Sequence, residues 1–300
     1  ALFSYGWKVL VSGLIDTIYT NIYTPILDVS RDPRWGRVME TYGEEPYLIA
    51  ELGIQVVEGI QAHGVASTLK HYAAYSVPKG GRDAAVRTDP HIAPRELHTL
   101  YMYPFKKVIQ TAHPMGVMSS YNDWDGVPVT ASRYFLTTLL REQYGFRGYV
   151  VSDSEAVEYV LTKHHVATSY GDAIRQCAEA GLNVRTNFTQ PDEFIKPLRE
   201  EIAEGRLSMK TVDERVAEVL RVKFQLGLFD NPYVRRLSTA HRSTTALRNI
   251  SRPKAWQPPT PRDATCATPC GPTARLCQPH LPTKSAATST LPWLLLPTAT

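Results

Sequence analysis

Residues 146–159 read FRGYVVSDSEAVEY, and this stretch decides how the chain is interpreted. Residues 148–151 are apolar or glycine and carry no charge, which is typical of a buried strand in a parallel sheet. Ser152, Asp153 and Ser154 end that run, and a helical pattern begins at Glu155. This order puts Asp153 at the carboxyl end of a strand, where α/β folds bind ligands. Cap preferences alone favour a simpler role, in which Asp153 caps the helix, so the other strand ends must decide.

Between residues 21 and 227, short apolar runs alternate with longer helical patterns, which indicates repeated βα units around a parallel sheet. Five runs are typical of strands: residues 22–29, 65–69, 116–120, 149–152 and 182–185. The helical patterns cover residues 44–64, 93–113, 132–144, 169–181, 190–208 and 209–229. We expect Thr211, with Glu214 three residues later, to open the last helix as a capping box.

The fold class predicted from this pattern is α/β, of the (β/α)8 TIM-barrel type. Polar residues end every run in the same manner: Asp28 and Arg31, Lys70 and His71, Tyr121 and Asn122, Asp153, and Asn187. A doubly wound sheet is disfavoured because no Gly-rich phosphate loop follows the first run. A full barrel needs about 250 residues, whereas only five strands are convincing here. We therefore expect an incomplete barrel that lacks N-terminal βα units.

Composition divides the chain into three parts. Residues 21–234 carry the βα pattern, residues 1–20 match it poorly, and residues 235–300 form a basic tail with ten Pro and twelve Thr but only one acid. We expect this tail to be disordered or to result from an out-of-frame translation. It lacks the clustered basic face or aromatic platform of a nucleic-acid site.

The positions of the cysteines and the hydropathy of the chain limit the kinds of site and segment it can contain. Three of the four cysteines lie in the tail, and Cys177 is predicted to serve as a small apolar residue on a helix. No disulfide framework or zinc spacing follows. Neither a signal peptide nor a membrane span is evident, although an absent N-terminus would hide either.

Candidate chemistry gathers at the strand ends. The segment RDPRWGR (residues 31–37) supplies three guanidinium groups around Trp35, which suit a polar ligand or, taken alone, a surface ion-pair loop. Lys70 and His71 could bind ligand hydroxyls, or could be a buried lysine beside a satisfied core histidine. Because parallel strands end at one edge, we expect these groups to converge on Asp153.

Aromatic and apolar residues accompany the third run. Met118, Tyr121 and Trp124 suit the C–H faces of a sugar and equally suit barrel packing. His164 and His165 follow the fourth run at a distance, and we expect them to lie on the solvated surface.

One ionised carboxylate among cationic and neutral donors is what a glycosidase nucleophile requires. Retaining glycosidases add a second, protonated carboxyl group about 5 to 5.5 Å away. Glu155, Asp123 and Asp125 are available for that role, but their spacing selects none of them.

Five segments in a fixed order carry a family resemblance. They are SRDPRWGRVMETYGEEPYL (30–48), STLKHYAAYSVPKGGRDAAVRTD (67–89), GVMSSYNDWDGVP (116–128), GFRGYVVSDSEAV (145–157) and AGLNV (180–184). With these segments, residues 21–234 resemble the N-terminal barrel domain of glycoside hydrolase family 3, and most closely its bacterial β-xylosidase/β-glucosidase branch.

The resemblance implies a retaining exo-acting β-glycosidase that uses no metal or organic cofactor. It implies that Asp153 is the nucleophile, and that the substrate is an oligosaccharide or aryl glycoside rather than a nucleic acid or a membrane. The implied substrate-binding residues are Arg37, Lys70, His71, Met118 and Tyr121. It also suggests a periplasmic or secreted location, whereas sugar specificity and oligomeric state stay open.

The chain also departs from the family pattern. The family's additional substrate-binding Asp would lie upstream of anything present, and its general acid/base usually lies on a second domain after the barrel. The N-acetylglucosaminidase branch is disfavoured because YAAYSVPKGG follows His71. Two alternatives therefore remain: a catalytically inactive sugar-binding fragment and, less favoured, a barrel lyase that forms a Schiff base at Lys70.

Overall fold

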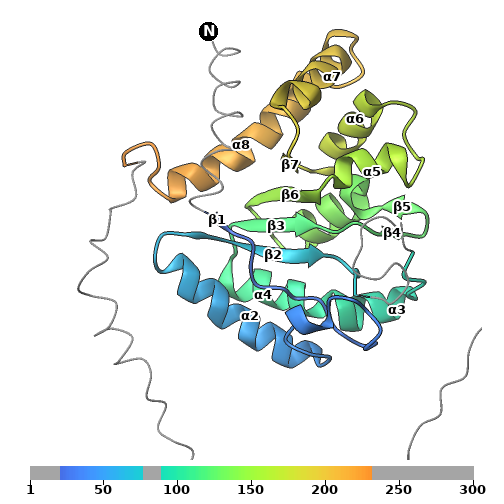
Figure 1. The fold of residues 1–300 in the computed structure, drawn as a ribbon. Coiled ribbons are helices and arrows are strands. Elements are labelled where there is room, and N and C mark those ends of the chain that lie inside the picture. Colours follow the sequence, from blue (N-terminus) through green and yellow to red (C-terminus); the bar gives the residue numbers. More distant parts are fainter. Residues whose placement is uncertain (1–20, 77–88, 232–300) are drawn as a thin grey trace, which may run out of the picture. The chain divides into compact units, whose positions relative to one another are not determined.

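The computed structural model describes residues 21–76 and 89–231. Their main sheet contains five strands in the order β1-β2-β3-β6-β7, and all neighbouring pairs are parallel (Figure 1). The strands are β1 (Asn21–Ile22), β2 (Ala66–Tyr72), β3 (Gly116–Ser119), β6 (Tyr149–Ser154) and β7 (Val184–Thr186). The predicted α/β class with a parallel sheet is confirmed, and within the described ranges the five strands do not close into a barrel.

The first strand continues as extended chain along β2. Ile26 forms an isolated parallel bridge with Lys70, and the Leu27 backbone N–H donates to the Lys70 carbonyl at 2.7 Å. The Lys70 N–H in turn donates to the Pro25 carbonyl at 3.0 Å. This pairing carries Asp28 to the carboxyl edge of the sheet, as the apolar run 22–29 indicates.

Helices connect the strands and follow the predicted patterns. The α-helices are α2 (Pro46–Gln61), α3 (Pro94–Glu96), α4 (Tyr103–Ala112), α5 (Ala156–Thr162), α6 (Tyr170–Ala180), α7 (Pro191–Ala203) and α8 (Met209–Gln225). The wider π-helices η2 (Leu97–Tyr101) and η4 (Tyr134–Gln143) occur where regular helix was expected. Short 3-10 turns η1 (Val38–Glu40) and η3 (Val129–Ala131) and the antiparallel pair β4 (Asp123–Trp124) and β5 (Val127–Pro128) complete the fold.

The start of α8 differs from the prediction. Ser208, rather than Thr211, is its N-cap, and the Ser208 hydroxyl accepts the Thr211 backbone N–H at 3.1 Å. The expected capping box at Thr211 and Glu214 is therefore wrong. The helix begins three residues earlier because Ser208 already satisfies a backbone donor that would otherwise be unpaired.

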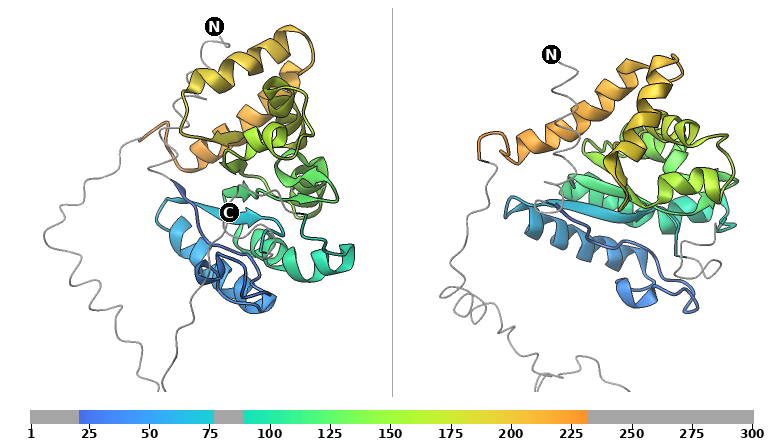
Figure 2. Two further views of the ribbon diagram at one scale, coloured as in Figure 1. Left: turned by 45° about the vertical axis from the view of Figure 1, so that its right-hand side comes forward. Right: turned by 45° about the horizontal axis from the view of Figure 1, so that its top comes forward.

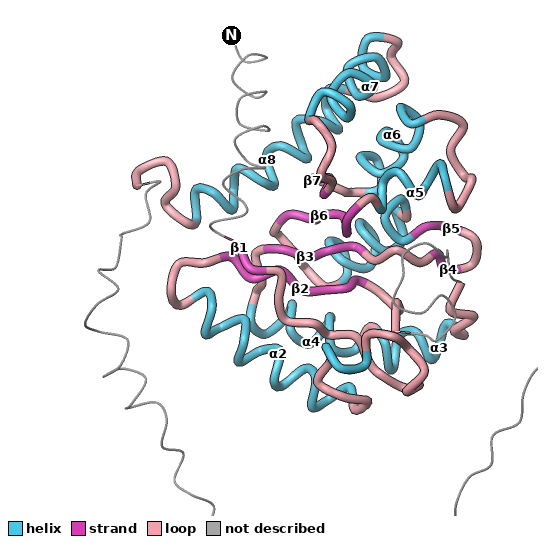
Figure 3. The backbone as a smooth tube through the Cα atoms, in the orientation of Figure 1, coloured by secondary structure: helices cyan, strands magenta, loops and turns pink. Residues whose placement is uncertain are grey.

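Alternate residues of the strands face two apolar clusters. Val117 and Val150 belong to the larger cluster, which also includes buried residues of α2, α4, η4, α5 and α6. Tyr149 and Val151 belong to a smaller cluster that is closed by Val222 of α8. Figures 1 and 2 show α2 and α8 on opposite sides of the main sheet, and Figure 3 shows the strands of this sheet in one row between the helices. Strand β6 is thus buried on both faces, as its apolar sequence predicts.

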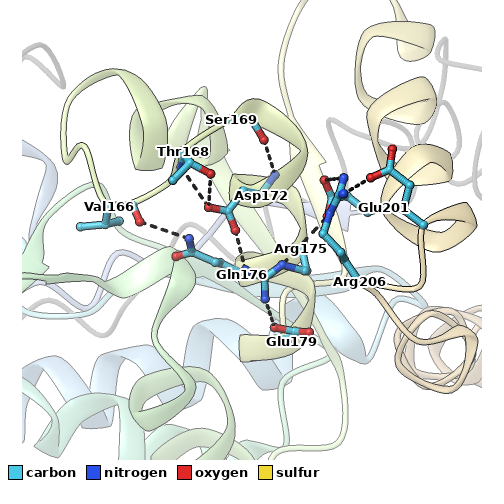
Figure 4. A network of polar contacts seen from close by, with 10 residues as sticks. Val166, Thr168, Ser169, Asp172, Arg175, Gln176, Glu179, Glu201 and Arg206 are labelled. Atoms are coloured by element: carbon cyan, nitrogen blue, oxygen red, sulfur yellow. Dashed lines mark hydrogen bonds and ion pairs between the residues drawn. The ribbon is translucent and has the colours of Figure 1, made fainter.

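A polar network joins the outer helices α6 and α7 (Figure 4). Asp172 accepts the backbone N–H of Thr168 at 2.9 Å and receives the Arg175 guanidinium. Arg175 also pairs with Glu179 at 2.9 Å and reaches Glu201 of α7 at 4.0 Å. Because Glu201 is itself held by Arg206 through two bonds of 2.8 Å, the network ties the two helices together.

A methyl group at Gly148 should destabilise the fold. A Cβ atom there would clash with the backbone carbonyl of Met115, which cannot move aside without disturbing the start of β6. We expect Gly148→Ala to lower the free energy of unfolding by about 2–3 kcal/mol in urea titrations. The matched control is Gly59→Ala in α2, where nothing lies within 4 Å, and it should raise stability by about 0.5–1 kcal/mol. Equal stability of the two variants would contradict this account.

The charge of Asp172 should make stability depend on pH. Burial raises its pKa, but the Thr168 N–H and the Arg175 guanidinium outweigh that effect and bring the pKa to about 2. A carboxylate with a depressed folded-state pKa contributes stability above about pH 4, and this contribution is lost as pH falls toward 2.

We expect Asp172→Asn to lower the free energy of unfolding by about 1–2 kcal/mol at pH 7. The difference from wild type should shrink as pH falls from 4 to 2, measured by urea titration at each pH. Asp192→Asn on exposed α7 surface is the control and should change stability by less than about 0.5 kcal/mol. A gap that stays constant with pH would rule out the assigned role of Asp172.

Candidate active site

Asp153 lies at the next-to-last position of β6, at the carboxyl edge of the sheet, with its side chain 13% exposed. Its Oδ1 accepts the Ser154 backbone N–H at 2.8 Å, whereas its buried Oδ2 has no hydrogen-bond partner among the described residues. The N-cap of α5 is Glu155, whose side chain forms no capping bond. The simpler role of Asp153 as a helix cap is therefore wrong, because its carboxylate is directed to the neighbouring strand end instead.

His71 lies between two carboxylates. Its Nδ1 is 2.8 Å from Asp28 Oδ2, and the same oxygen accepts the His71 backbone N–H at 3.1 Å. On the other side of the ring, Nε2 is 3.6 Å from Asp153 Oδ2. Tyr75 packs edge-on against the imidazole with ring centroids 5.3 Å apart. Both His71 and Asp28 are almost completely buried, so these contacts are shielded from solvent.

Arg37 is the member of the RDPRWGR segment that turns toward this edge. Its guanidinium donates two hydrogen bonds to Glu40, at 3.0 and 2.7 Å, and lies 5.8 Å from the centre of the Tyr75 ring. Burial alone would lower the pKa of Arg37, but bonding to Glu40 outweighs it and the pKa is raised. Arg34, by contrast, pairs with Asp32 on the surface, as the ion-pair interpretation of this loop suggested.

Lys70 is half-buried and carries a perturbed amine. Burial lowers its pKa, and the neighbouring positive charge of Arg37 lowers it further. The carboxylates of Asp153, Glu40 and Asp28 act in the opposite direction without reversing the shift. The site therefore combines a charged guanidinium with an amine whose charge is easier to remove than usual.

Tyr121 follows β3 and faces Asp153. Burial raises the pKa of its hydroxyl, and the negative charge of Asp153 raises it further, so the hydroxyl stays protonated. His164 holds the backbone here, because its Nε2 lies 3.0 Å from the Tyr121 carbonyl oxygen. The expectation that His164 lies on the solvated surface is wrong: the residue is buried, and its Nδ1 is 3.9 Å from Asp123 Oδ1. His165 is exposed as expected.

Aromatic rings line this edge in a continuous series. Trp35 contacts Tyr75, Tyr75 contacts Tyr121, and Tyr121 contacts Tyr159, with centroid separations of 5.6, 5.8 and 5.7 Å. Trp124 does not join them, because its ring stacks on Tyr134 and its Nε1–H donates to a backbone carbonyl. Of the two roles that the sequence left open for Trp124, sugar contact and packing, the structure shows packing.

The structure thus brings together most of the predicted site residues. Asp153, His71, Lys70 and Arg37 are linked by contact or charge, and Tyr121 lies beside them. Met118 packs in the smaller apolar cluster, so its contact with a ligand stays a prediction. Glu40 and Tyr75 emerge from the structure, and Asp28 joins the site through its contact with His71. The strand-end pattern already singled out Asp28, but its contact with His71 spans 43 residues of sequence.

Residues 21–76 and 89–231 contain neither a cluster of metal ligands nor a helix that could span a membrane. In these ranges, no three His, Cys, Asp or Glu side chains come together as metal ligands. None of the helices there has the length and apolar character needed to cross a bilayer. Cys177 is buried in α6 as predicted, and burial raises the pKa of its thiol.

A partly buried carboxylate with one unpaired oxygen, next to an imidazole, an amine, a guanidinium and phenol rings, can bind a polyhydroxylated ligand and attack an electrophilic carbon. Fold and site together define an α/β protein of the parallel-sheet type with a carboxylate-centred candidate active site. Residues 6–222 match the model of the glycosyl hydrolase family 3 N terminal domain, and the chain belongs to this family, as the resemblance implied. The TIM-barrel type of fold is thereby confirmed as a class.

Known relatives agree with this assignment. The chain is 34% identical over 246 residues to the xylan 1,4-β-xylosidase of Xylanibacter ruminicola, covering 79% of this chain and 28% of that protein. It is 34% identical over 218 residues to the periplasmic β-glucosidase of Salmonella typhimurium, covering 70% and 27%. The structure of a β-glucosidase from Listeria innocua in complex with isofagomine matches with a TM-score of 0.68 and 34% identity, over 81% of this chain and 34% of that chain. The chain therefore spans less than a third of the length of the two curated relatives.

The perturbed amine of Lys70 can be tested directly. We expect Lys70 to titrate below the ordinary value of 10.5, and Arg37→Gln to move its pKa upward because one neighbouring positive charge is removed. Competitive acetylation of the lysines across pH, read by peptide mass spectrometry, measures both effects. Arg34→Gln removes a surface guanidinium and is the control. An unchanged titration of Lys70 in Arg37→Gln would show that Arg37 does not influence it.

Proposed function

We propose that this chain is the nucleophile-bearing part of a retaining β-glycosidase that removes terminal xylose or glucose from short plant-polysaccharide fragments. The observation that carries the proposal is Asp153, a carboxylate with a buried unpaired oxygen among groups that suit sugar hydroxyls. The names of the relatives, a xylan 1,4-β-xylosidase and a β-glucosidase, support the two sugars. A periplasmic relative supports a periplasmic or secreted location.

The first chemical step is attack by Asp153 on the anomeric carbon. Oδ2 supplies the electron pair, the bond to the glycosidic oxygen breaks, and a glycosyl ester forms on Asp153 while the leaving group takes up a proton. Water then attacks the same carbon and gives a proton to the group that protonated the leaving group, the ester bond breaks, and Asp153 regains its charge as the sugar leaves. Inversion in each of two steps gives overall retention.

The neighbouring side chains hold the sugar in this scheme. Arg37 and Lys70 donate hydrogen bonds to hydroxyl oxygens, and the Nε2 edge of His71 faces the same space beside Asp153. Tyr121 offers its ring to the apolar side of the sugar, and the buried Tyr75 packs against Tyr121 edge-on. These contacts orient the anomeric carbon toward Oδ2, which supplies the positioning part of the rate enhancement.

The proton donor of the first step is unassigned. Among the candidates, Glu155 receives the Tyr159 hydroxyl at 2.9 Å, Asp123 lies against His164, and Asp125 is exposed. In the family this group usually lies on a second domain. We therefore propose that the chain by itself forms the ester readily only when the leaving group needs no proton.

Covalent trapping tests the nucleophile. The reagent is a 2,4-dinitrophenyl 2-deoxy-2-fluoro-β-xyloside or the matching glucoside, whose leaving group departs without protonation and whose fluorine slows ester hydrolysis. We expect one fluoroglycosyl group on the peptide that contains Asp153, measured by mass spectrometry of the digested chain. Asp153→Asn should abolish labelling, because a neutral amide is a poor nucleophile.

Glu155→Gln is the matched control and should still be labelled, since it removes a nearby carboxylate that the proposal does not use as nucleophile. Labelling of a different residue in the wild-type chain would overturn the assignment of Asp153. Complete absence of labelling by both sugars would favour the alternative of an inactive sugar-binding fragment.

A further inference from the structure

We infer that Asp28 is a positioning residue for His71: it fixes the orientation and the proton position of the imidazole so that Nε2 is left for the sugar beside Asp153. The inference deepens the proposed function and rests on it for the identity of the ligand. It assigns a role to a carboxylate that lies outside the groups proposed to touch the substrate.

The contact between Asp28 and His71 has two parts that share one oxygen. Oδ2 of Asp28 lies 3.1 Å from the His71 backbone nitrogen and 2.8 Å from Nδ1. A backbone N–H can only donate, so this oxygen must be an acceptor. A carboxylate oxygen carries no proton of its own, so its 2.8 Å contact with Nδ1 places the ring proton on Nδ1.

Placement of the proton on Nδ1 determines what the other ring nitrogen does. Nε2 is 3.6 Å from Asp153 Oδ2, which is too long for a direct hydrogen bond. Nε2 is therefore the polar atom of His71 that is available to a ligand hydroxyl at the nucleophile. If the ring rotated about χ2, this atom would be exchanged for a carbon and the contact would be lost.

The backbone around Asp28 holds the pair in register. Leu27, directly before Asp28, donates its N–H to the carbonyl of Lys70, directly before His71. Both side chains therefore extend from backbones that are already hydrogen-bonded to one another. Both side chains are also 1% exposed, so water does not compete for the contact. Tyr75, edge-on at 5.3 Å, restricts the ring from a further side.

His164 provides an internal comparison. Its Nε2 faces the Tyr121 carbonyl oxygen at 3.0 Å, and a carbonyl can only accept, so the proton of this ring belongs on Nε2. The two buried histidines, His71 and His164, are thus assigned protons on different nitrogens. In His71 the nitrogen without the assigned proton is Nε2. Among the described contacts of the two histidines, this is the ring nitrogen that faces Asp153 Oδ2.

Substitutions at Asp28 separate a positioning role from simple structural support. Asp28→Asn keeps one side-chain oxygen. The backbone N–H of His71 needs an acceptor, so the amide is oriented with its oxygen toward His71. The Nδ1–H of His71 therefore keeps its acceptor as well. Asp28→Leu has the same branching at Cγ and a larger side chain, and it removes the acceptor for both donors. A purely structural role would affect folding in either variant without moving the proton on the ring.

The test uses the full 300-residue chain labelled with ¹⁵N, and His71 is assigned by comparison with His71→Gln. Long-range ¹H–¹⁵N spectra report which ring nitrogen is protonated, and calorimetry measures isofagomine binding. We expect Nδ1 to be protonated in wild type and in Asp28→Asn, and the preference to be lost in Asp28→Leu. Isofagomine should bind Asp28→Leu about 10- to 100-fold more weakly than wild type, and Asp28→Asn should recover at least about tenfold of that loss.

The inference is overturned if Nδ1 of His71 is unprotonated in wild type. It is also overturned if Asp28→Leu changes neither the proton position of His71 nor the affinity for isofagomine. If Asp28→Leu does not fold, loss of the Nδ1 proton in Asp28→Asn overturns it and retention supports it. Asp89→Asn, next to the exposed His91, is the control and should leave His71 unchanged. Failure of wild type to bind isofagomine counts against the proposed function, whereas the proton position still decides the role of Asp28.

Discussion

The parallel register of β2, β3 and β6 is the constraint on which the candidate site depends. Leu69 pairs with Val117, and Val117 pairs with Val150, so the three strands end at one edge. A shift of one residue would turn every side chain of a strand to the other face. Such a shift in β6 would move Val150 out of the larger apolar cluster and Asp153 away from His71. Apolar packing beneath the edge therefore fixes the polar geometry above it.

Donor groups at this edge are backed by carboxylates. Arg37 is held by Glu40, and His71 is held by Asp28, so each donor group is oriented before any ligand arrives. Lys70 differs, because burial and the charge of Arg37 lower its pKa. Preorganised donors of this kind reduce the ordering that a ligand has to impose on binding. The arrangement suits a site that recognises several hydroxyl groups at once.

Sequence reasoning was most successful where periodicity and strand order determine the outcome. Each of the five expected strands overlaps a strand of the sheet, and the strand-end rule placed His71 next to Asp153. It failed where an outcome depends on a single side-chain contact. Ser208 rather than Thr211 caps α8, and His164 is buried because Tyr121 offers it a carbonyl across 43 residues. The Ser208 cap is a local contact between near neighbours in sequence, whereas the partner of His164 is supplied by the tertiary fold and cannot be read from local propensities.

Asp153 shows why cap preference and function can compete for one residue. A cap would satisfy the carboxylate within its own chain segment, and a buried acceptor without a partner costs about 1–3 kcal/mol. The structure nevertheless leaves Oδ2 buried and unpaired while Oδ1 is satisfied by Ser154. A hydrogen bond from a backbone N–H would make a capping oxygen a weaker nucleophile than an oxygen that accepts none. The free-energy cost of leaving Oδ2 unpaired fits a carboxylate that is kept available for chemistry. The strand end that predicts a helix start also places this carboxylate beside His71.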